Sequence, residues 1–387
     1  MFRNSLTSLV RQSGYTNVVA RNLYSASVLG LDGYKNYREK TKTQYMHNID
    51  NFKRKMREFV AGSNTNMIFT EDLKNVVHLV ENTPEDKKLL LDMIDKYNSQ
   101  GQELRFGNYI FGPVVMRALY FLDDPELAVK LFKDEKYKGF FDQLSTYQIL
   151  GDLLYQHGQY SQVRELFDVI KTRQVDSGRY PRYSVTLTFA ACYKENSEES
   201  FQYAMSLWKE LNAMGHTPMR KAIAFAAALA LKHNKPDIAL EITSSLSQAN
   251  YVTIRQIKIL ALVALGRLDD IVPIFRAVLE VGGPLEKKQT FCREVIQQLN
   301  SRISSKDSEI PQDMQRMLEY LETNGHINDS TLDELLCQDI VTAPRKETYN
   351  NLAESYKSRG GTQQLRSFAP NRTQRSRFSR PGLADMN

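Results

Sequence analysis

The chain has 387 residues, of which 42% are hydrophobic and 25% are charged, a composition typical of a globular protein with a buried core. Its three cysteines lie far apart and form no Cys-x-x-Cys pair, which argues against a disulfide framework and a zinc knuckle. The net charge of +6 includes +3 from residues 1–30 and +6 from residues 357–387, so residues 31–356 carry −3. Non-specific electrostatic binding of nucleic acid across the whole body is therefore not predicted.

Residues 1–31 have the composition of a mitochondrial transit peptide. They contain Arg3, Arg11 and Arg21, five serines and no acidic residue, and their first apolar residues share one helical face. We predict that this leader directs the protein to the mitochondrial matrix and is cleaved between about residues 22 and 32. No stretch of 18 apolar residues follows, so no membrane span is predicted.

A basic segment with interleaved aromatic residues follows, inside a predicted N-terminal helical region over residues 32–108. Residues 35–57 hold eight basic side chains. Because basic side chains contact phosphates and aromatic rings stack on unpaired bases, Lys53, Arg54 and Lys55 are candidate RNA contacts. The apolar residues of the segment also recur at helical spacing, so a solvated basic face on a docked helix is the alternative.

Two further helices are predicted before the central region. Thr70 is predicted to be the N-cap of a helix, because Glu71 and Asp72 follow it and place acidic side chains in the first turn. Thr83 followed by Pro84 is a fuller start, because proline suits the first helical position.

A pattern of three residue types recurs at regular intervals through residues 109–286. Each occurrence has an apolar anchor, a small or branched apolar residue three positions earlier, and a turn residue about eight positions earlier. The anchors are separated by 35, 41, 35 and 32 residues, a period typical of a helical solenoid. They are Leu131, Phe132, Leu166, Phe167, Leu207, Trp208, Ile242, Ile274 and Phe275.

Each unit has the pattern of two helices joined by a tight turn. In one unit, apolar residues recur at helical spacing over residues 147–155 and again over 163–170. Gly158 lies between them and tolerates the positive φ that a sharp turn requires. We therefore predict an all-α fold, a right-handed α-solenoid of stacked helical hairpins with helical flanking segments and a disordered basic C-terminal tail.

These units resemble pentatricopeptide repeats, which are helical hairpins. The sequence LWKEL at residues 207–211, followed by MGHTP at 214–218, is similar to the second helix and the Gly-x-x-Pro exit of that family. The units at residues 144–178 and 185–219 resemble the family best.

The resemblance implies that single-stranded RNA lies in a concave groove lined by the first helices. In this family each base is read by the fifth and the last residue of a unit, usually Asn, Ser or Thr with Asp or Asn. The pairs transferred by register depart from that code, so base-by-base readout is not expected, and Gln148 and Gln256 are the best candidates for base contact. The pairs are Pro113 with Gln143, Gln148 with Gly178, Phe189 with Met219, Ala224 with Ile254, and Gln256 with Glu286.

The chain after the repeats divides into two parts. Residues 287–340 are predicted to form a helical cap, with amphipathic helices over 289–299 and 311–321 and a short helix near 330–339. Residues 341–387 form a basic tail of low hydrophobicity, which predicts disorder. Such a tail either holds RNA loosely or is merely solvated.

No catalytic or metal-binding constellation stands out in the sequence. The six histidines are dispersed without metal-ligand spacing, and the acidic pairs at residues 123–124 and 269–270 lie in predicted turns. We therefore expect a protein that is not an enzyme and needs no metal or other cofactor.

Two functions of different class remain open. The resemblance implies a mitochondrial RNA-binding factor that binds single-stranded mitochondrial RNA and assists transcript processing and maturation, and thereby respiratory chain biogenesis, while a separate nuclease acts. The alternative is a protein–protein scaffold bound to mitochondrial ribosomal proteins. The acidic body and the apolar residues at the code positions favour this alternative.

Overall fold

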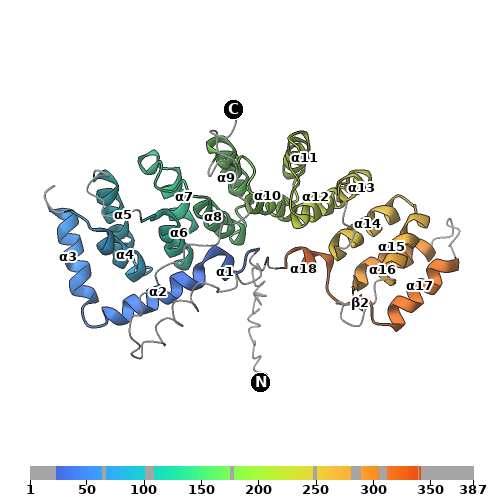
Figure 1. Ribbon diagram of the computed structural model, residues 1–387, viewed down its shortest axis with the longest axis horizontal. Coiled ribbons are helices and arrows are strands. Elements are labelled where there is room, and N and C mark those ends of the chain that lie inside the picture. Colours follow the sequence, from blue (N-terminus) through green and yellow to red (C-terminus); the bar gives the residue numbers. More distant parts are fainter. Residues whose placement is uncertain are drawn as a thin grey trace, which may run out of the picture. The chain divides into compact units, whose positions relative to one another are not determined.

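The structure is a computed structural model that describes residues 23–62, 67–100, 109–174, 178–246, 251–279, 289–304, 312–338 and 340. Helices account for nearly all of the regular structure in this part of the chain, which confirms the predicted all-α solenoid (Figure 1). The first 22 residues of the predicted leader and the predicted tail over residues 341–387 lie outside the described residues. None of the described helices is long and apolar enough to cross a membrane.

The described residues between 109 and 279 form five helical hairpins, one for each predicted anchor. Two short 3-10 helices, η2 (Glu135–Tyr137) and η4 (Asp269–Ile271), lie in the connections. The hairpins are α6–α7 (Gly112–Phe121 and Pro125–Lys133), α8–α9 (Leu144–Gln156 and Tyr160–Arg173), α10–α11 (Arg182–Glu195 and Glu198–Ala213), α12–α13 (Arg220–Lys232 and Pro236–Ser244) and α14–α15 (Val252–Ala264 and Val272–Leu279).

Each hairpin turns at a residue with a left-handed backbone. The turn residues are glycine, asparagine or aspartate, the types that adopt positive φ at the lowest cost. Their φ values lie between 51° and 72°, and they are Asp123, Gly158, Asn196, Asn234 and Gly266. Gly158 was predicted as the turn between the two helices of its unit, and Asp123 belongs to the acidic pair that was predicted to lie in a turn.

The repeat anchors hold the two helices of each hairpin and its neighbours together. They lie on the second helices and are buried there, except Ile274, which is half-buried. In this position their side chains fill the space between adjacent hairpins, as stacking of a solenoid requires.

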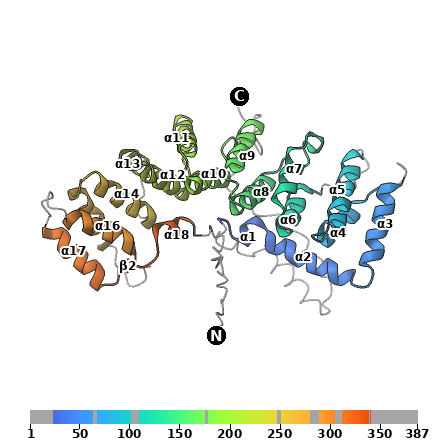
Figure 2. The same cartoon turned by 180° about the vertical axis from the view of Figure 1, so that it is seen from behind.

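A hairpin flanks the five repeats at each end. Helices α4 (Thr70–Leu79) and α5 (Pro84–Ser99) precede them, and α16 (Arg293–Ser304) and α17 (Gln312–Thr323) follow. Helix α3 (Ile49–Ala61) packs on α5. The first helices of all these hairpins, from α4 through α16, pack side by side in one layer, with the second helices α5, α7, α9, α11 and α13 on one of its faces (Figures 1 and 2).

Of the two helix starts predicted before the repeats, the structure confirms that of α5 and moves the cap of α4 by one residue. The Thr83 hydroxyl accepts a hydrogen bond from the Asp86 N–H (3.3 Å) and begins α5, as predicted. Thr70 is the first residue of α4 and not its cap. The cap is Phe69, whose N–H donates to the Asp72 carboxylate (3.2 Å).

The C-terminal cap contains a short parallel sheet that the sequence did not predict. Strand β1 (Phe291–Cys292) pairs with β2 (Ile327–Asn328). The helix expected from residue 289 therefore begins at Arg293, after the strand. The helices expected over 311–321 and 330–339 are α17 and the shorter α18 (Leu332–Leu336).

A third group of elements covers the opposite face of the first-helix layer, which we call the inner face. Helices α1 (Ala26–Leu29), α2 (Leu31–Gln44) and α18 lie on this side in Figures 1 and 2. Helix α2 packs on α4 and α6, α1 packs on α8, and α18 packs on α12 and α14. The inner face is the one that the sequence resemblance assigned to RNA.

The two ends of the described chain meet on the inner face. The Ile340 N–H donates to the Leu23 carbonyl (2.9 Å), and the Ser25 N–H donates to the Ile340 carbonyl (3.5 Å). The Tyr24 hydroxyl donates to the carbonyl of Tyr183 on α10. Leu23 and Tyr24 are both fully buried, so these segments are part of the core.

The central helices of the layer are consequently enclosed on all sides. Every residue from 184 to 193 in α10 and from 222 to 230 in α12 is buried. A helix that is buried all round needs packing partners on both faces. The second helices provide one partner, and the terminal segments provide the other.

Candidate nucleic-acid interface

Most of the code positions on the first helices are inaccessible. Phe189 and Ala224 are fully buried, and Pro113 is buried as well. Gln148 is half-buried on α8. Among the described residues, the inner face therefore offers no row of exposed side chains at the code positions.

Gln256 has a structural role in α14. Its side chain is fully buried, its amide oxygen accepts from the Cys292 N–H (3.0 Å), and its amide nitrogen donates to the Thr290 carbonyl (3.4 Å). These bonds satisfy backbone groups beside β1 that would otherwise be buried without partners. Gln256 is therefore not part of the candidate interface.

The three predicted basic contacts on α3 have different environments. Lys53 is only 12% exposed and forms an ion pair with Asp86 (2.5 Å), which ties α3 to the start of α5. Arg54 is exposed and bonds to Asn51 and Glu58 on its own helix. Lys55 is exposed and forms no ion pair with any described residue. Only Lys55 is fully available to a ligand.

The alternative reading of α3, a docked helix with a solvated basic face, agrees with the packing of its core-facing side. Phe52 and Met56 are buried, and the Phe52 ring lies 4.8 Å from the ring of Tyr45. The helix thus docks through its apolar residues and turns Arg54 and Lys55 outward, whereas Lys53 pairs with Asp86.

Helix α2 carries a second group of basic residues. Arg38 is buried; it donates to the His78 carbonyl (2.8 Å) and pairs with Glu81 (3.0 Å), which fixes α2 against the end of α4. Lys35 and Lys40 are exposed and have no ion pair with a described residue. No described carboxylate therefore neutralises their positive charge.

A cavity of about 610 Å³ lies between α2, α4 and the start of α6. We call it the α2–α4–α6 cavity. Its volume falls within the range of about 300–1000 Å³ that is usual for small-molecule sites. Its charged and aromatic wall is formed by Tyr37, Lys40, Lys74, His78, Tyr109 and Arg117, together with Tyr34 and Glu71.

Helical spacing brings these side chains to one place. Tyr37 and Lys40 are three residues apart on α2, and Lys74 and His78 are four residues apart on α4, so each pair shares a helix face. Arg117 projects from α6. Gly30, which joins α1 to α2 with φ +70°, leaves the space for it, since a Cβ there would meet Arg117 Nη2 at 3.0 Å.

The cavity has an excess of positive charge. Lys40, Lys74 and Arg117 line it, against the single carboxylate of Glu71. Glu71 pairs with Lys74 (2.7 Å), and the Lys74 ammonium lies 4.2 Å from the centre of the Tyr109 ring. Arg117 is half-buried and forms no ion pair within the described part of the chain. Its Nε–H donates to the Leu29 carbonyl (2.8 Å), and burial lowers the pKa of its guanidinium.

His78 contributes a neutral ring to the wall. Its Nδ1–H donates to the Lys74 carbonyl (2.7 Å), and its ring stacks on Tyr34 with the ring centres 5.1 Å apart. Burial lowers the pKa of His78 below its ordinary value of 6.5, so the ring is uncharged at neutral pH. The positive charge of the cavity therefore comes from the lysines and the arginine.

The described residues contain no grouping that suggests metal chemistry. Nowhere in this part of the chain do three or more His, Cys, Asp or Glu side chains lie together in a way that could hold a metal ion. The acidic residues Asp123 and Asp124 lie in the turn between α6 and α7, where Asp124 caps α7 by accepting from the Leu127 N–H (3.0 Å).

Comparison with known proteins gives a consistent set of relatives, although no protein-family model matches the chain. The relative from Danio rerio, "Pentatricopeptide repeat-containing protein 2, mitochondrial", is 30% identical over 272 residues, which are 70% of each chain. The proteins of the same name from Xenopus laevis and Homo sapiens are 29% identical over 272 residues and 27% identical over 301 residues. These matches cover 70% of both chains for Xenopus laevis, and 77% of this chain and 73% of the relative for Homo sapiens.

Proposed function

The chain belongs to the family of mitochondrial pentatricopeptide repeat-containing protein 2, and from this membership we propose that it is a non-catalytic RNA-binding factor of the mitochondrial matrix. In this role it holds single-stranded mitochondrial RNA while separate enzymes process it. It thereby assists transcript maturation and respiratory chain biogenesis.

The observation that carries this proposal is the distribution of charge along the folded body. Residues 31–61, which include α2 and α3, hold eight basic and four acidic residues and so carry +4. Residues 62–356 carry −7. A concentrated positive surface on an acidic body favours binding of a phosphate backbone at one place. Lys35 and Lys40 on α2 and Lys55 on α3 are exposed, form no ion pair with a described residue and contribute to this charge.

The proposed leader ends before Leu23. Leu23, Tyr24 and Leu29 are buried and would be lost from the core if cleavage occurred after residue 31. Mass spectrometry of the protein purified from mitochondria should therefore find a mature N-terminus at or before Leu23. A mature chain that begins after Tyr24 would contradict this boundary.

A scaffold function is the second candidate, and the covered inner face favours it. With α1, α2 and α18 packed on the first helices, the groove that this kind of repeat would offer to RNA is filled by the chain itself. The exposed surfaces of the second helices would then bind protein partners, among them mitochondrial ribosomal proteins or a processing nuclease.

Crosslinking in intact mitochondria tests the two candidates against each other. Irradiation followed by denaturing purification should recover RNA with the wild-type protein. It should recover several-fold less RNA with a variant in which Lys35, Lys40 and Lys55 are replaced by glutamine, because the unpaired cations are gone.

The matched control for this experiment replaces three exposed cations of other elements, Lys130, Lys209 and Lys235, and should recover as much RNA as the wild type. Recovery of ribosomal proteins or a nuclease without RNA would favour the scaffold.

A further inference from the structure

The α2–α4–α6 cavity combines the two kinds of group that a nucleotide needs. One part of its wall is cationic, and another part carries aromatic rings that solvent can reach. We propose that this cavity binds a nucleotide of single-stranded RNA, with the phosphate at Arg117 and Lys40 and the base stacked on Tyr37 or Tyr109. The inference rests on the proposed RNA-binding function, because it names where on the protein the RNA is held.

Arg117 is the main reason to expect an anion in the cavity. A half-buried guanidinium is normally neutralised by a carboxylate, since burial of a charge without a partner is costly. Here its Nε–H binds a backbone carbonyl, no carboxylate of the described chain pairs with it, and burial lowers its pKa. A phosphate would supply the missing negative charge, and guanidinium groups bind phosphate oxygens through two parallel hydrogen bonds.

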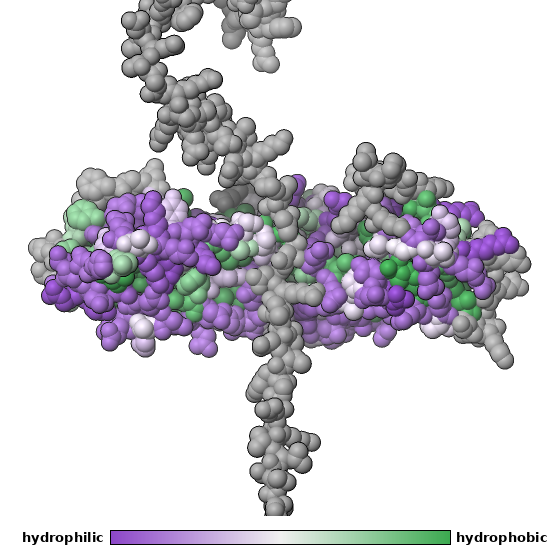
Figure 3. All heavy atoms as spheres, turned by 90° about the horizontal axis from the view of Figure 1, so that it is seen from below, coloured by the Kyte–Doolittle hydropathy of each residue, from purple (hydrophilic) through white to green (hydrophobic). Residues whose placement is uncertain are grey.

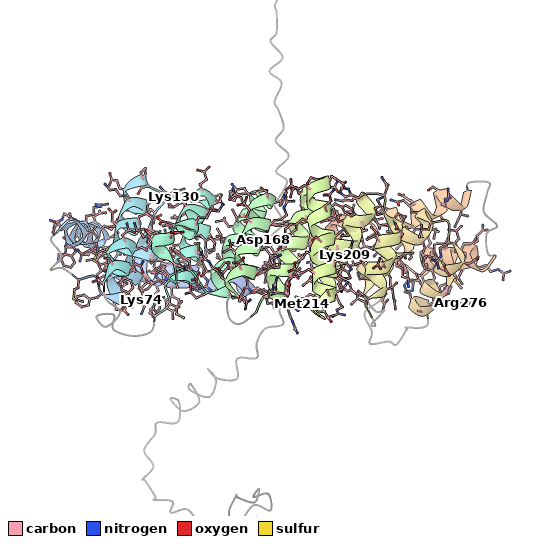
Figure 4. All side chains as sticks on the ribbon, turned by 90° about the horizontal axis from the view of Figure 1, so that it is seen from above. Lys74, Lys130, Asp168, Lys209, Met214 and Arg276 are labelled. Atoms are coloured by element: carbon pink, nitrogen blue, oxygen red, sulfur yellow. The ribbon has the colours of Figure 1, made fainter. Side chains whose placement is uncertain are left out.

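Lys40 and Lys74 strengthen the preference for an anion. Lys40 is exposed at the same wall without an ion pair to a described residue. Lys74 is shared between Glu71 and the Tyr109 ring. Lys74 lies near the N-terminal end of the row of helices, on the edge opposite Lys130 (Figure 4).

Tyr37 and Tyr109 are the reason to expect a base. Tyr37 is 64% exposed and Tyr109 is 37% exposed, so solvent reaches both side chains. Lys74 holds the Tyr109 ring by a cation–π contact, so part of the platform is ordered before a ligand arrives. Stacking of this kind requires unpaired bases, which duplex RNA does not present.

Gln44 adds hydrogen-bonding capacity to the same wall. It follows Lys40 by four residues on α2, lines the cavity and makes no hydrogen bond to a described residue. A side-chain amide both donates and accepts, as the edge of a base requires. Seen from the side on which α2 and α18 lie, the surface of the described residues is largely hydrophilic, with smaller apolar patches (Figure 3).

An acidic or phosphorylated peptide is the competing ligand, because it would also satisfy Arg117. The two accessible rings favour RNA, since a base has a flat face that covers a tyrosine ring and a phosphorylated serine does not. The experiment below includes such a peptide as a competitor.

The test measures affinity of the full mature chain for a short labelled single-stranded RNA by fluorescence anisotropy at two salt concentrations. Tyr37→Ala and Arg117→Gln should each weaken binding by about tenfold, because the first removes a base-stacking contact and the second a charged phosphate contact. Lys40→Gln should lower the salt slope by about 0.7, the value for one lost phosphate contact on a single strand. Arg117→Lys should restore part of the affinity lost in Arg117→Gln.

Exposed residues far from the cavity provide the matched controls. Tyr320→Ala on α17 removes a ring that is 54% exposed, and Lys209→Gln on α11 removes an exposed cation. Both variants should bind RNA like the wild type. Because Tyr37 and Lys40 are exposed as well, their loss should not unfold the protein, and circular dichroism of each variant would verify this.

The possible outcomes separate the inference from the function on which it rests. If the wild type binds RNA and the cavity variants bind equally well, the cavity is not the site and the proposed function still stands. If the wild type shows no saturable RNA binding at moderate salt, both are wrong. Displacement of the RNA by a duplex of the same sequence as effectively as by the single strand would also overturn the inference. So would tighter binding of the phosphorylated peptide than of RNA.

Discussion

Replacing Phe167 by alanine is expected to lower the free energy of unfolding by about 3–5 kcal/mol, the range for large aromatic side chains in cores. Phe167 is 1% exposed on α9, and α9 packs on both α8 and α10. Removing its ring leaves a cavity between two hairpins that the stacked helices cannot close. Urea unfolding followed by circular dichroism measures the loss.

Ser161→Ala on the same helix is the matched control. Ser161 is exposed, so its replacement should change stability by less than about 0.5 kcal/mol. Equal tolerance of the two changes would contradict the assignment of residues 166 and 167 as the anchor between adjacent hairpins.

Replacing Tyr24 by alanine should destabilise the protein to a similar extent, by about 3–5 kcal/mol. Tyr24 is 1% exposed, its hydroxyl donates to the Tyr183 carbonyl, and its ring meets the Tyr183 ring edge-on at 5.7 Å. Burial raises the pKa of Tyr24 well above its ordinary value, so the hydroxyl keeps the proton that it donates. The change should also speed hydrogen exchange of α8 and α10, because α1 packs on α8 and Tyr24 binds α10, and the N-terminal segment would no longer cover them.

Two further variants separate the contribution of the Tyr24 ring from that of its hydroxyl. Tyr24→Phe keeps the ring and removes only the hydroxyl, which should cost about 0.5–1.5 kcal/mol, the usual net contribution of one hydrogen bond. Tyr320→Ala removes an exposed ring and should be nearly neutral. If Tyr24→Ala were as well tolerated as Tyr320→Ala, the inner face would not be covered in solution.

The repeat architecture could be predicted because its determinants are local. The anchors, the small residues three positions earlier and turn residues such as Gly158 recur within one unit, and each hairpin buries its apolar face against the next. The same reasoning located the start of α5 at Pro84, where the cap and the proline are adjacent in sequence.

The covering of the inner face was not predicted, because it joins residues that are far apart. Leu23 and Ile340 are separated by more than three hundred residues, and no local pattern pairs them. An indirect signal was present at residues 222–230, where alanine, isoleucine, leucine and phenylalanine leave no polar face. A helix that is apolar all round is buried all round, so an additional covering segment could have been expected.

The candidate site was predicted only in part. A sequence shows where the charged and polar residues are, but it does not show which residues pair with them in the fold. The basic segment was identified, but Lys53 turned out to be paired with Asp86, which lies 33 residues later. Gln256 is a polar residue in an apolar helix that binds backbone groups 34 and 36 residues away. Arg117 was overlooked, although it is the one charged residue in the otherwise apolar α6 and so had a signal of its own.

A decisive measurement for RNA binding is to identify which peptides of the protein carry crosslinked nucleotides after irradiation in mitochondria. RNA binding in the α2–α4–α6 cavity predicts that mass spectrometry will find them within residues 31–44 and 109–121, which include Tyr37, Tyr109 and Arg117 of the cavity wall. Crosslinks confined to α8, α10, α12 and α14 would contradict it, because RNA would then lie on the inner face that α1, α2 and α18 cover.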